Sequence, residues 1–180
     1  MDFTVEILKY PSEEDWMLCK TCTLNTVGKT STKLPTEEWR KKILLSEHSP
    51  IRTVNFCIKM ILPYYVSVHF CRHFIGVTHF VQSQRNDRQD NYDRTKAPQD
   101  STVSHIMYIN AQELMFMARR RLCMQADPYT RNVMNEIKRQ VEKKCPEFIG
   151  TLEPMCSYRG GRCTEFNPCG LNKKYLEENK

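Results

Sequence analysis

The chain has 180 residues, of which 40% are hydrophobic and 27% charged, and its formal net charge is +6. This length and composition fit one globular domain with a sizeable core, and we find no repeats or low-complexity segments. No apolar run has the length of a membrane span and no signal peptide opens the chain, so we expect a cytoplasmic protein without a membrane partner. Because the positive residues are scattered, a local anion site is favoured over nucleic-acid binding.

The N-terminal half predicts two strands and three helices. Alternating or β-branched residues indicate the strands. A capping hydroxyl followed by acidic residues, or a proline at the first turn, indicates each helix start. The predicted strands are 2–10 and 51–62, and the predicted helices are 12–24, 36–47 and 63–70.

The C-terminal half predicts helices and a tail. Residues 84–101 are polar and read as irregular, whereas 110–124 and 127–144 predict helices, the second beginning at an Asp-Pro cap. We therefore expect an α+β fold in which a small mixed sheet packs with helices. The expected organisation is a main domain at 1–152 and a Cys-rich tail at 153–180.

Cationic and polar donors gather between residues 72 and 94. Arginine presents a rigid fork of donors that matches phosphate or carboxylate oxygens, so this stretch predicts a pocket for a phosphorylated small molecule. The candidate ligands among these donors are Arg72, His73, Ser83, Gln84, Arg85 and Arg94.

A further arginine, Arg121, lies on one face of the predicted helix 110–124. Asn110, Leu114, Met117 and Arg121 share that face, and about 1.5 Å of rise per residue separates Asn110 from Arg121 by roughly 16 Å. This spacing suits the two ends of an extended ligand. Alternatively, the basic end of the helix is solvated and complements the helix dipole.

The nine cysteines of a cytoplasmic protein are read as core thiols or metal ligands. Cys145, Cys156, Cys163 and Cys169 lie in or near the tail, which is rich in Gly and Pro and forms little core. Four thiolates can close a tetrahedral zinc site, so we take these cysteines as candidate zinc ligands.

Arg72-His73-Phe74, an eight-residue gap and Ser83-Gln84-Arg85 together resemble the signature of the flavin-dependent thymidylate synthases. The usual signature has a third arginine and a slightly shorter gap. The resemblance extends over about residues 44–146, through His48-Ser49-Pro50 upstream and Asn110-Ala111-Gln112-Glu113-Leu114 downstream.

The resemblance implies a thymidylate synthase-like catalytic domain that methylates dUMP to dTMP. The implied cofactors are FAD, methylene-tetrahydrofolate and NADPH, and the implied assembly is a homotetramer with sites at subunit interfaces. By position in the motif, the family's roles give flavin contacts to Arg72, His73, Asn110 and Gln112, nucleotide contacts to Ser83, Gln84, Arg85, Arg94 and Arg121, and catalytic roles to Arg121 and His48.

Three departures fall on the flavin side of this pattern. Phe74 and Gln112 stand where the family has arginine, and Gln125 stands where it often has histidine. Two alternatives follow. One is a relative that binds dUMP-like nucleotides and performs another C5 modification, such as hydroxymethylation, without flavin. The other is a non-catalytic, zinc-stapled module that binds nucleotides or nucleic acid.

Overall fold

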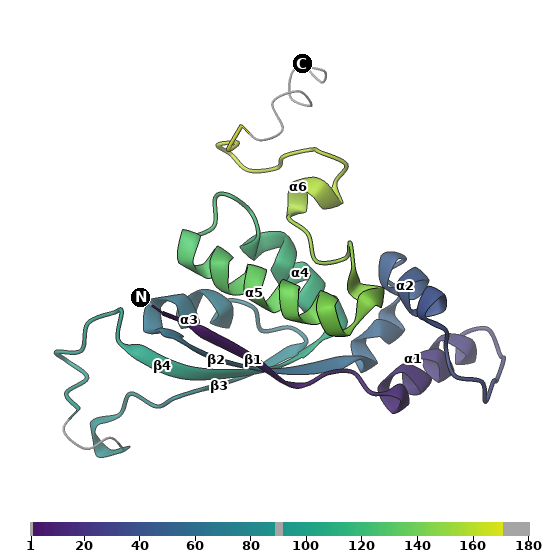
Figure 1. Cartoon of the computed structure of the whole chain (residues 1–180), viewed down its shortest axis with the longest axis horizontal. Helices are drawn as coiled ribbons and strands as arrows, with labels where there is room; N and C mark the ends of the chain where they lie inside the picture. The colour runs from purple at the N-terminus through teal and green to yellow at the C-terminus, as the bar shows by residue number, and fades with distance from the viewer. Residues whose placement is uncertain (1, 89–91, 171–180) are drawn as a thin grey trace.

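A four-stranded antiparallel sheet with helices on one face forms the centre of the molecule (Figure 1). The computed structural model describes residues 2–88 and 92–170. The strand order is β1-β2-β4-β3. The strands are β1 (Thr4–Lys9), β2 (Asn55–Pro63), β3 (Val77–Val81) and β4 (Thr102–Asn110).

Helices α3, α4 and α5 lie over one face of the sheet, and α1 and α2 lie at one end of it (Figure 1). The helices are α1 (Glu13–Asn25), α2 (Glu37–Leu45), α3 (Tyr64–Cys71), α4 (Ala111–Arg121), α5 (Pro128–Lys144) and α6 (Met155–Tyr158). Short 3-10 helices are η1 (Ser49–Thr53), η2 (Asn86–Arg88) and η3 (Pro146–Phe148).

Local capping explains where several helices begin. Ser12 and Asp15 form a reciprocal capping box at the start of α1, and Thr36 accepts from the backbone of Trp39 at the start of α2. Asp127 caps α5, with a proline following it in the first turn. These three starts agree with the sequence prediction to within one residue.

The two faces of the sheet differ in composition because side chains alternate along each strand. Phe56 pairs with Ile109 and Ile58 with Met107, and all four are fully buried beneath the helices. No described helix covers the opposite face, where Phe80 and Tyr108 on neighbouring strands β3 and β4 are exposed.

The predicted α+β class is confirmed, but the sheet is purely antiparallel rather than mixed. The sequence prediction missed β3 and β4. Both strands are half-polar and carry histidines, His79 and His105, on the face beneath the helices, so they do not show the expected apolar alternation. The start of the predicted strand 51–62 is instead the 3-10 helix η1.

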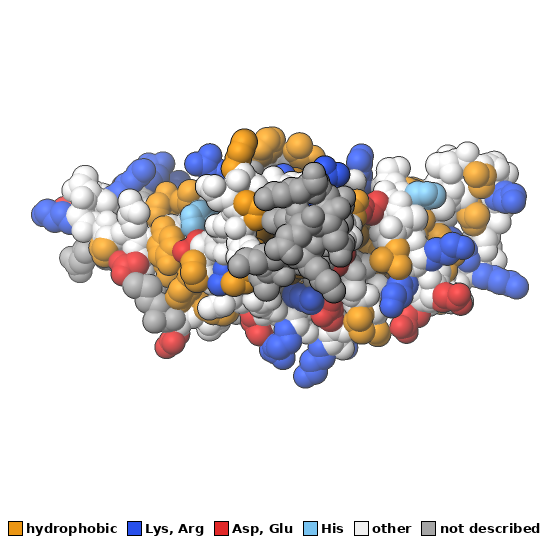
Figure 2. Space-filling view, turned by 90° about the horizontal axis from the view of Figure 1, so that it is seen from above, with side chains coloured by type: hydrophobic (Ala, Val, Ile, Leu, Met, Phe, Trp, Pro, Cys, Tyr) orange, Lys and Arg blue, Asp and Glu red, His pale blue; other side chains and the backbone are white. Residues whose placement is uncertain are grey.

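The tail follows α5 through η3 and α6 and is described as far as residue 170; the remaining residues of the predicted unit 153–180 lie outside the described part. In the face shown in Figure 2, basic and acidic side chains are interspersed, as the modest net charge suggests. No helix among the described residues is both long and apolar enough to pass through a bilayer.

Candidate functional site

A cleft lies between the segment 72–76, which joins α3 to β3, and helix α4. It consists of two adjoining hollows of ≈ 300 and ≈ 320 Å³, which share Ile75, Glu113 and Phe116. The first hollow is lined further by Arg72, His73, Phe74, Arg120 and Arg121, and the second by Glu47, Arg52, Gly76, Asn110, Gln112 and Arg119. We call these two hollows the α4 cleft.

Asn110 and Gly76 fix the relation between the two walls of the cleft. The Asn110 side chain caps α4 by accepting from the backbone N–H of Glu113 at 2.9 Å. The Asn110 backbone N–H donates to the Gly76 carbonyl at 2.9 Å. Gly76 has a φ of +77°, and a Cβ there would lie 2.4 Å from Asn110 Nδ2, so this junction requires glycine.

The buried His73 side chain is held from both sides. Its Nδ1 lies 2.8 Å from Glu113 Oε1, and the Nε–H of Arg121 points to its Nε2 at 3.2 Å. Because a guanidinium only donates, Nε2 must accept, and the proton must be on Nδ1 and shared with Glu113. The neighbours of His73 thus select one tautomer of a neutral imidazole.

Arginines concentrate positive charge in the first hollow. Arg121 also donates to the His69 carbonyl at 2.6 Å, but it has no acidic partner within the described residues. Burial, and then the nearby charges of Arg120 and Arg72, lower the pKa of Arg121. Arg120 lies 3.9 Å from Glu165, a long ion pair at the edge of the hollow. Crowded guanidinium groups of this kind favour an anionic ligand.

Exposed apolar surface borders the charged part of the cleft. Phe74 is 77% and Ile75 72% exposed, and Phe116 contacts the His73 ring edge-on with the centroids 5.9 Å apart. Aromatic side chains at a cationic hollow can stack against a planar base. The cleft therefore combines the features that would recognise an anion and a flat ring.

Several residues singled out in the sequence come together in the α4 cleft. Arg72, His73 and Arg121 line the first hollow, while Asn110 and Gln112 line the second. Gln112 accepts a hydrogen bond from Arg52, and Asn110 serves as the helix cap described above. Within the single chain, two parts of the motif that are far apart in sequence thus meet at one site.

The sequence reasoning missed Glu113, Phe116 and Arg120. These residues follow the spacing i, i+3, i+7 and so share one face of α4. That face was identifiable from the sequence, but we considered the neighbouring face that carries Asn110 and Arg121.

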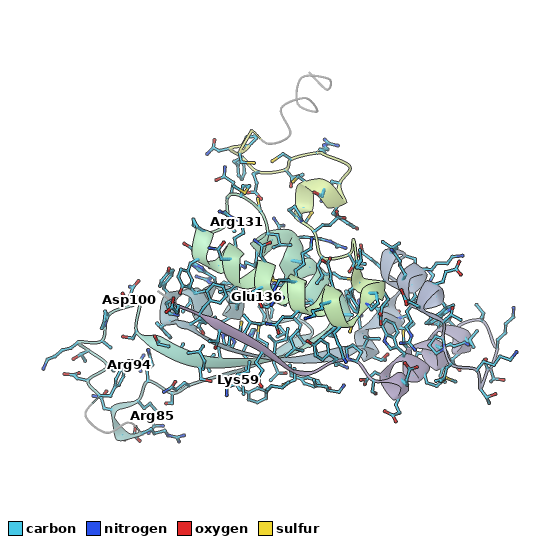
Figure 3. All side chains as sticks on the ribbon, viewed as in Figure 1. Lys59, Arg85, Arg94, Asp100, Arg131 and Glu136 are labelled. Carbon is cyan, nitrogen blue, oxygen red and sulfur yellow. The ribbon has the colours of Figure 1, made fainter. Side chains whose placement is uncertain are left out.

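The remaining predicted nucleotide ligands lie elsewhere. Ser83, Gln84, Arg85 and Arg94 belong to the β3–β4 connection, and none of them lines the cleft. Figure 3 shows Arg85 and Arg94 at the end of the sheet opposite α1 and α2. Arg85 forms a bidentate ion pair with Asp87, in which two guanidinium nitrogens lie 2.8 and 2.6 Å from the two carboxylate oxygens. A single chain does not bring these four residues to Arg121.

His48 also lies apart from the cleft. It precedes η1 and lines a separate hollow of ≈ 190 Å³ with residues of α1 and α2, including Thr23 and Trp39. Gln125 lines the hollow beside the tail.

The cysteines proposed as zinc ligands are divided between two places. Cys156, Cys163 and Cys169 line a small cavity of ≈ 50 Å³ together with Cys123, which the sequence reasoning had not included. Cys145 is instead buried at the end of α5, where burial, followed by the charge of Glu147, raises its pKa to about 12. The structure therefore separates Cys145 from the tail thiols.

Comparison with known proteins gives a match in structure only. No protein-family model matches the chain, and neither does any curated protein sequence. Among solved structures, the chain resembles the crystal structure of a UMP/dUMP methylase, PolB from Streptomyces cacaoi, bound with 5-Br dUMP, with a TM-score of 0.62 and 13% identity over 85% of this chain and 98% of that chain. The same methylase bound with 5-Br UMP gives a TM-score of 0.59 and 15% identity over 85% and 97% of the two chains.

These matches correct the family expected from the sequence. The three-dimensional likeness is to a UMP/dUMP methylase, and the assignment to the flavin-dependent thymidylate synthases is wrong. The signature on which that assignment depended has Phe74 in place of its third arginine and a longer gap. The expectation of FAD and NADPH loses its basis with it. At 13% and 15% identity, the comparisons establish that this chain has the fold of a pyrimidine nucleotide methylase.

Proposed function

We propose that this protein is an enzyme that binds a pyrimidine nucleoside monophosphate, dUMP or UMP, in the α4 cleft and transfers a one-carbon unit to C5 of the uracil ring. The observation that carries the proposal is the group of guanidinium side chains of Arg72, Arg120 and Arg121 at one hollow, beside exposed aromatic surface. The fold shared with a UMP/dUMP methylase supports the same ligand class.

The proposed binding mode uses the differences in exposure between the arginines. Arg72 and Arg120, at the open side of the hollow, bind the phosphate, whose nearly double negative charge suits two fixed cations. The uracil ring packs on Phe116. Arg121, already held by His73 and the His69 carbonyl, donates one of its remaining N–H groups to a uracil carbonyl.

This placement has a chemical consequence at C5. A cation at the uracil carbonyl stabilises negative charge that develops on that oxygen as C5 attacks an electrophilic carbon. His73 and Glu113 keep the Arg121 guanidinium in one orientation, so no rearrangement is needed at that step. We propose methylene-tetrahydrofolate as the carbon donor. A hydroxymethyl product then needs only water, whereas a methyl product needs a hydride donor as well.

Binding of the ligand is tested by calorimetry with dUMP, UMP and uridine. We expect both nucleotides to bind and uridine to bind much more weakly. Arg121→Ala removes a charge-assisted hydrogen bond of about 1.5–3 kcal/mol, which corresponds to a loss of about 10–150-fold in affinity. Arg139→Gln is the matched control, because Arg139 is an exposed arginine on α5 that pairs with Glu136. Equal affinity for uridine and UMP, or equal effects of the two substitutions, would contradict the proposal.

The reaction is tested with dUMP and UMP that carry tritium at C5. Each is incubated with the protein and methylene-tetrahydrofolate, and the tritium released from C5 is measured. Mass spectrometry of the product distinguishes methyl from hydroxymethyl transfer. If both nucleotides bind and no tritium leaves C5 with this donor or with formaldehyde, C5 transfer is refuted while nucleotide binding stands.

We further propose that the β3–β4 connection completes the site of a neighbouring copy in a homotetramer. The exposed Phe80 and Tyr108 on the uncovered sheet face support an assembly, and Arg85 and Arg94 lie away from the cleft of their own chain. Arg85→Ala and Arg121→Ala variants, each inactive alone, should regain activity when they are mixed and allowed to exchange subunits. Absence of any recovery in a mixture shown to exchange would assign the whole site to one chain.

A further inference from the structure

Three potential metal ligands meet between the end of α3 and the inner face of the sheet. Cys71 is the last residue of α3, and His79 and His105 lie on the neighbouring strands β3 and β4. Within the described ranges, these side chains form the one group of three or more Cys, His, Asp or Glu whose ligand atoms all lie within 4.8 Å of one another.

Both histidines have one ring nitrogen held by a protein group. His79 Nε2 lies 2.6 Å from the His73 carbonyl, and His105 Nδ1 lies 2.9 Å from Ser67 Oγ. The other two nitrogens, His79 Nδ1 and His105 Nε2, face each other at 2.8 Å. Metal-bound histidines characteristically have this arrangement, in which an outer partner fixes the ring and its tautomer while the inner nitrogen binds the ion.

The hydrogen bonds define the metal-free protonation state. A carbonyl only accepts, so His79 carries a proton on Nε2, and in the neutral ring its Nδ1 lone pair points at His105. His105 Nε2 must therefore donate to His79, and its Nδ1 accepts from the Ser67 hydroxyl. His105 is fully buried, and burial followed by the proximity of His79 lowers its pKa to about 4, which keeps it neutral.

We propose that a divalent zinc ion binds to Cys71, His79 and His105 and leaves its fourth position open to water. Imidazole and thiolate ligands are those that zinc prefers, and three protein ligands with an open position form a common zinc geometry. The ion takes the place of the proton now shared by the two imidazoles. The proposal does not depend on what the α4 cleft binds.

Zinc binding moves one proton within the site and releases another to solvent. The His105 proton moves from Nε2 to Nδ1 and is donated to Ser67, so the imidazole stays neutral. The Cys71 thiol loses its proton to solvent and binds as thiolate, so one proton is released for each ion bound.

The two imidazoles need to move only a little to bind the ion. Tetrahedral zinc with Zn–N bonds of about 2.0–2.1 Å separates two ligand nitrogens by about 3.3 Å, so the imidazoles must part by roughly half an ångström. Cys71 is exposed and gives the ion a route from solvent. The bound ion would also fix His79, whose Nε2 holds the carbonyl of His73 at the wall of the α4 cleft.

The experiment titrates metal-free, full-length protein with zinc and with cobalt, a spectroscopic substitute. We expect the ligand-field bands of four-coordinate cobalt, a thiolate-to-cobalt charge-transfer band, and one proton released per zinc ion bound at this site. Cys71→Ser should abolish the charge-transfer band and, like His79→Gln, weaken binding by at least about a hundredfold. Ser67→Ala should weaken it by about 10–100-fold, as loss of an outer partner does. Cys57→Ser on the opposite sheet face is the control and should leave the titration unchanged.

Cys123 and the tail thiols Cys156, Cys163 and Cys169 line one cavity that could bind a second ion, so each variant is also made with Cys156 and Cys163 changed to serine. The thiolate-to-cobalt charge-transfer band should persist in the protein that lacks Cys156 and Cys163, and it should still be lost when Cys71 is also replaced. If it vanishes there, the ion belongs to the tail and the proposal is overturned. It is likewise overturned if Cys71→Ser and Cys57→Ser titrate alike, or if folded wild-type protein binds neither metal.

Discussion

Replacing Gly76 by alanine tests whether the junction between the two walls of the α4 cleft is as tight as described. The substitution adds one methyl group at a position with a φ of +77°, within 2.4 Å of Asn110 Nδ2. The nearest contact is the far end of a side chain, so we expect Asn110 to move rather than the backbone. Asn110 would then lose its capping hydrogen bond to the Glu113 N–H.

The expected loss in the free energy of unfolding of Gly76→Ala has two parts. A non-glycine residue in the left-handed region costs about 1–2 kcal/mol. Loss of an Asn cap costs about 0.5–2 kcal/mol. Together they predict that Gly76→Ala lowers the free energy of unfolding by about 1.5–4 kcal/mol. Gly28 is the matched control, because its φ is +66° and a Cβ there would meet nothing within 4 Å, so Gly28→Ala should cost only the first part.

Urea denaturation followed by circular dichroism measures both variants. A double-mutant cycle with Asn110→Ala isolates the contact, since the methyl group at 76 has no side-chain amide to displace once Asn110 is alanine. The combined cost should therefore be smaller than the sum of the single costs by about 0.5–2 kcal/mol. The reasoning is refuted if Gly76→Ala is no more destabilising than Gly28→Ala, or if the two substitutions are additive.

Three further predictions use other parts of the structure. Glu47→Ala leaves the buried guanidinium of Arg119 without its ion-pair partner and should cost about 3 kcal/mol in urea unfolding; a cost below about 1 kcal/mol would contradict the pairing. Hydrogen bonds from Arg139 lower the folded-state pKa of Glu136 to about 2, so its contribution is complete above the unfolded pKa near 4.5 and is lost as the pH falls toward 2. Because this pair is solvated, Glu136→Gln should cost no more than about 1 kcal/mol at neutral pH, and acid unfolding curves of the two proteins should converge near pH 2. Cys145, whose pKa burial raises to about 12, should resist iodoacetamide at pH 8 while the half-buried Cys57 is alkylated, as peptide mass spectrometry would show.

The contact between segment 72–76 and helix α4 was predictable from the sequence motifs. The order of Arg72-His73 and the helix from Asn110 to Arg121 indicated that these residues serve one site, and the structure places them at one cleft. The same reasoning put Arg85 and Arg94 there, but they lie on a connection at the far end of the sheet. Sequence order alone does not state whether a residue serves its own chain or a neighbouring one.

The pair His79 and His105 could not be predicted from the sequence. His79 and His105 are separated by 26 residues and become neighbours only because β3 pairs antiparallel with β4 in one register. A shift of one residue in that register would turn one of them to the other face. Their polarity also concealed the strands from which they come, so the best candidate metal ligands lay in segments that the sequence reasoning had left without structure.

By itself the sequence determined the helix starts at Ser12, Thr36 and Asp127, the α+β class, and the concentration of arginine near residue 72. These features depend on capping, composition and spacing within a few residues, which act locally along the chain. Only the tertiary structure decided that the sheet is antiparallel throughout, that Glu113 orients His73, and that Cys123 rather than Cys145 lies beside the tail thiols. Each of these depends on burial and pairing between segments far apart in sequence, and those long-range contacts form only when the chain folds around a common core.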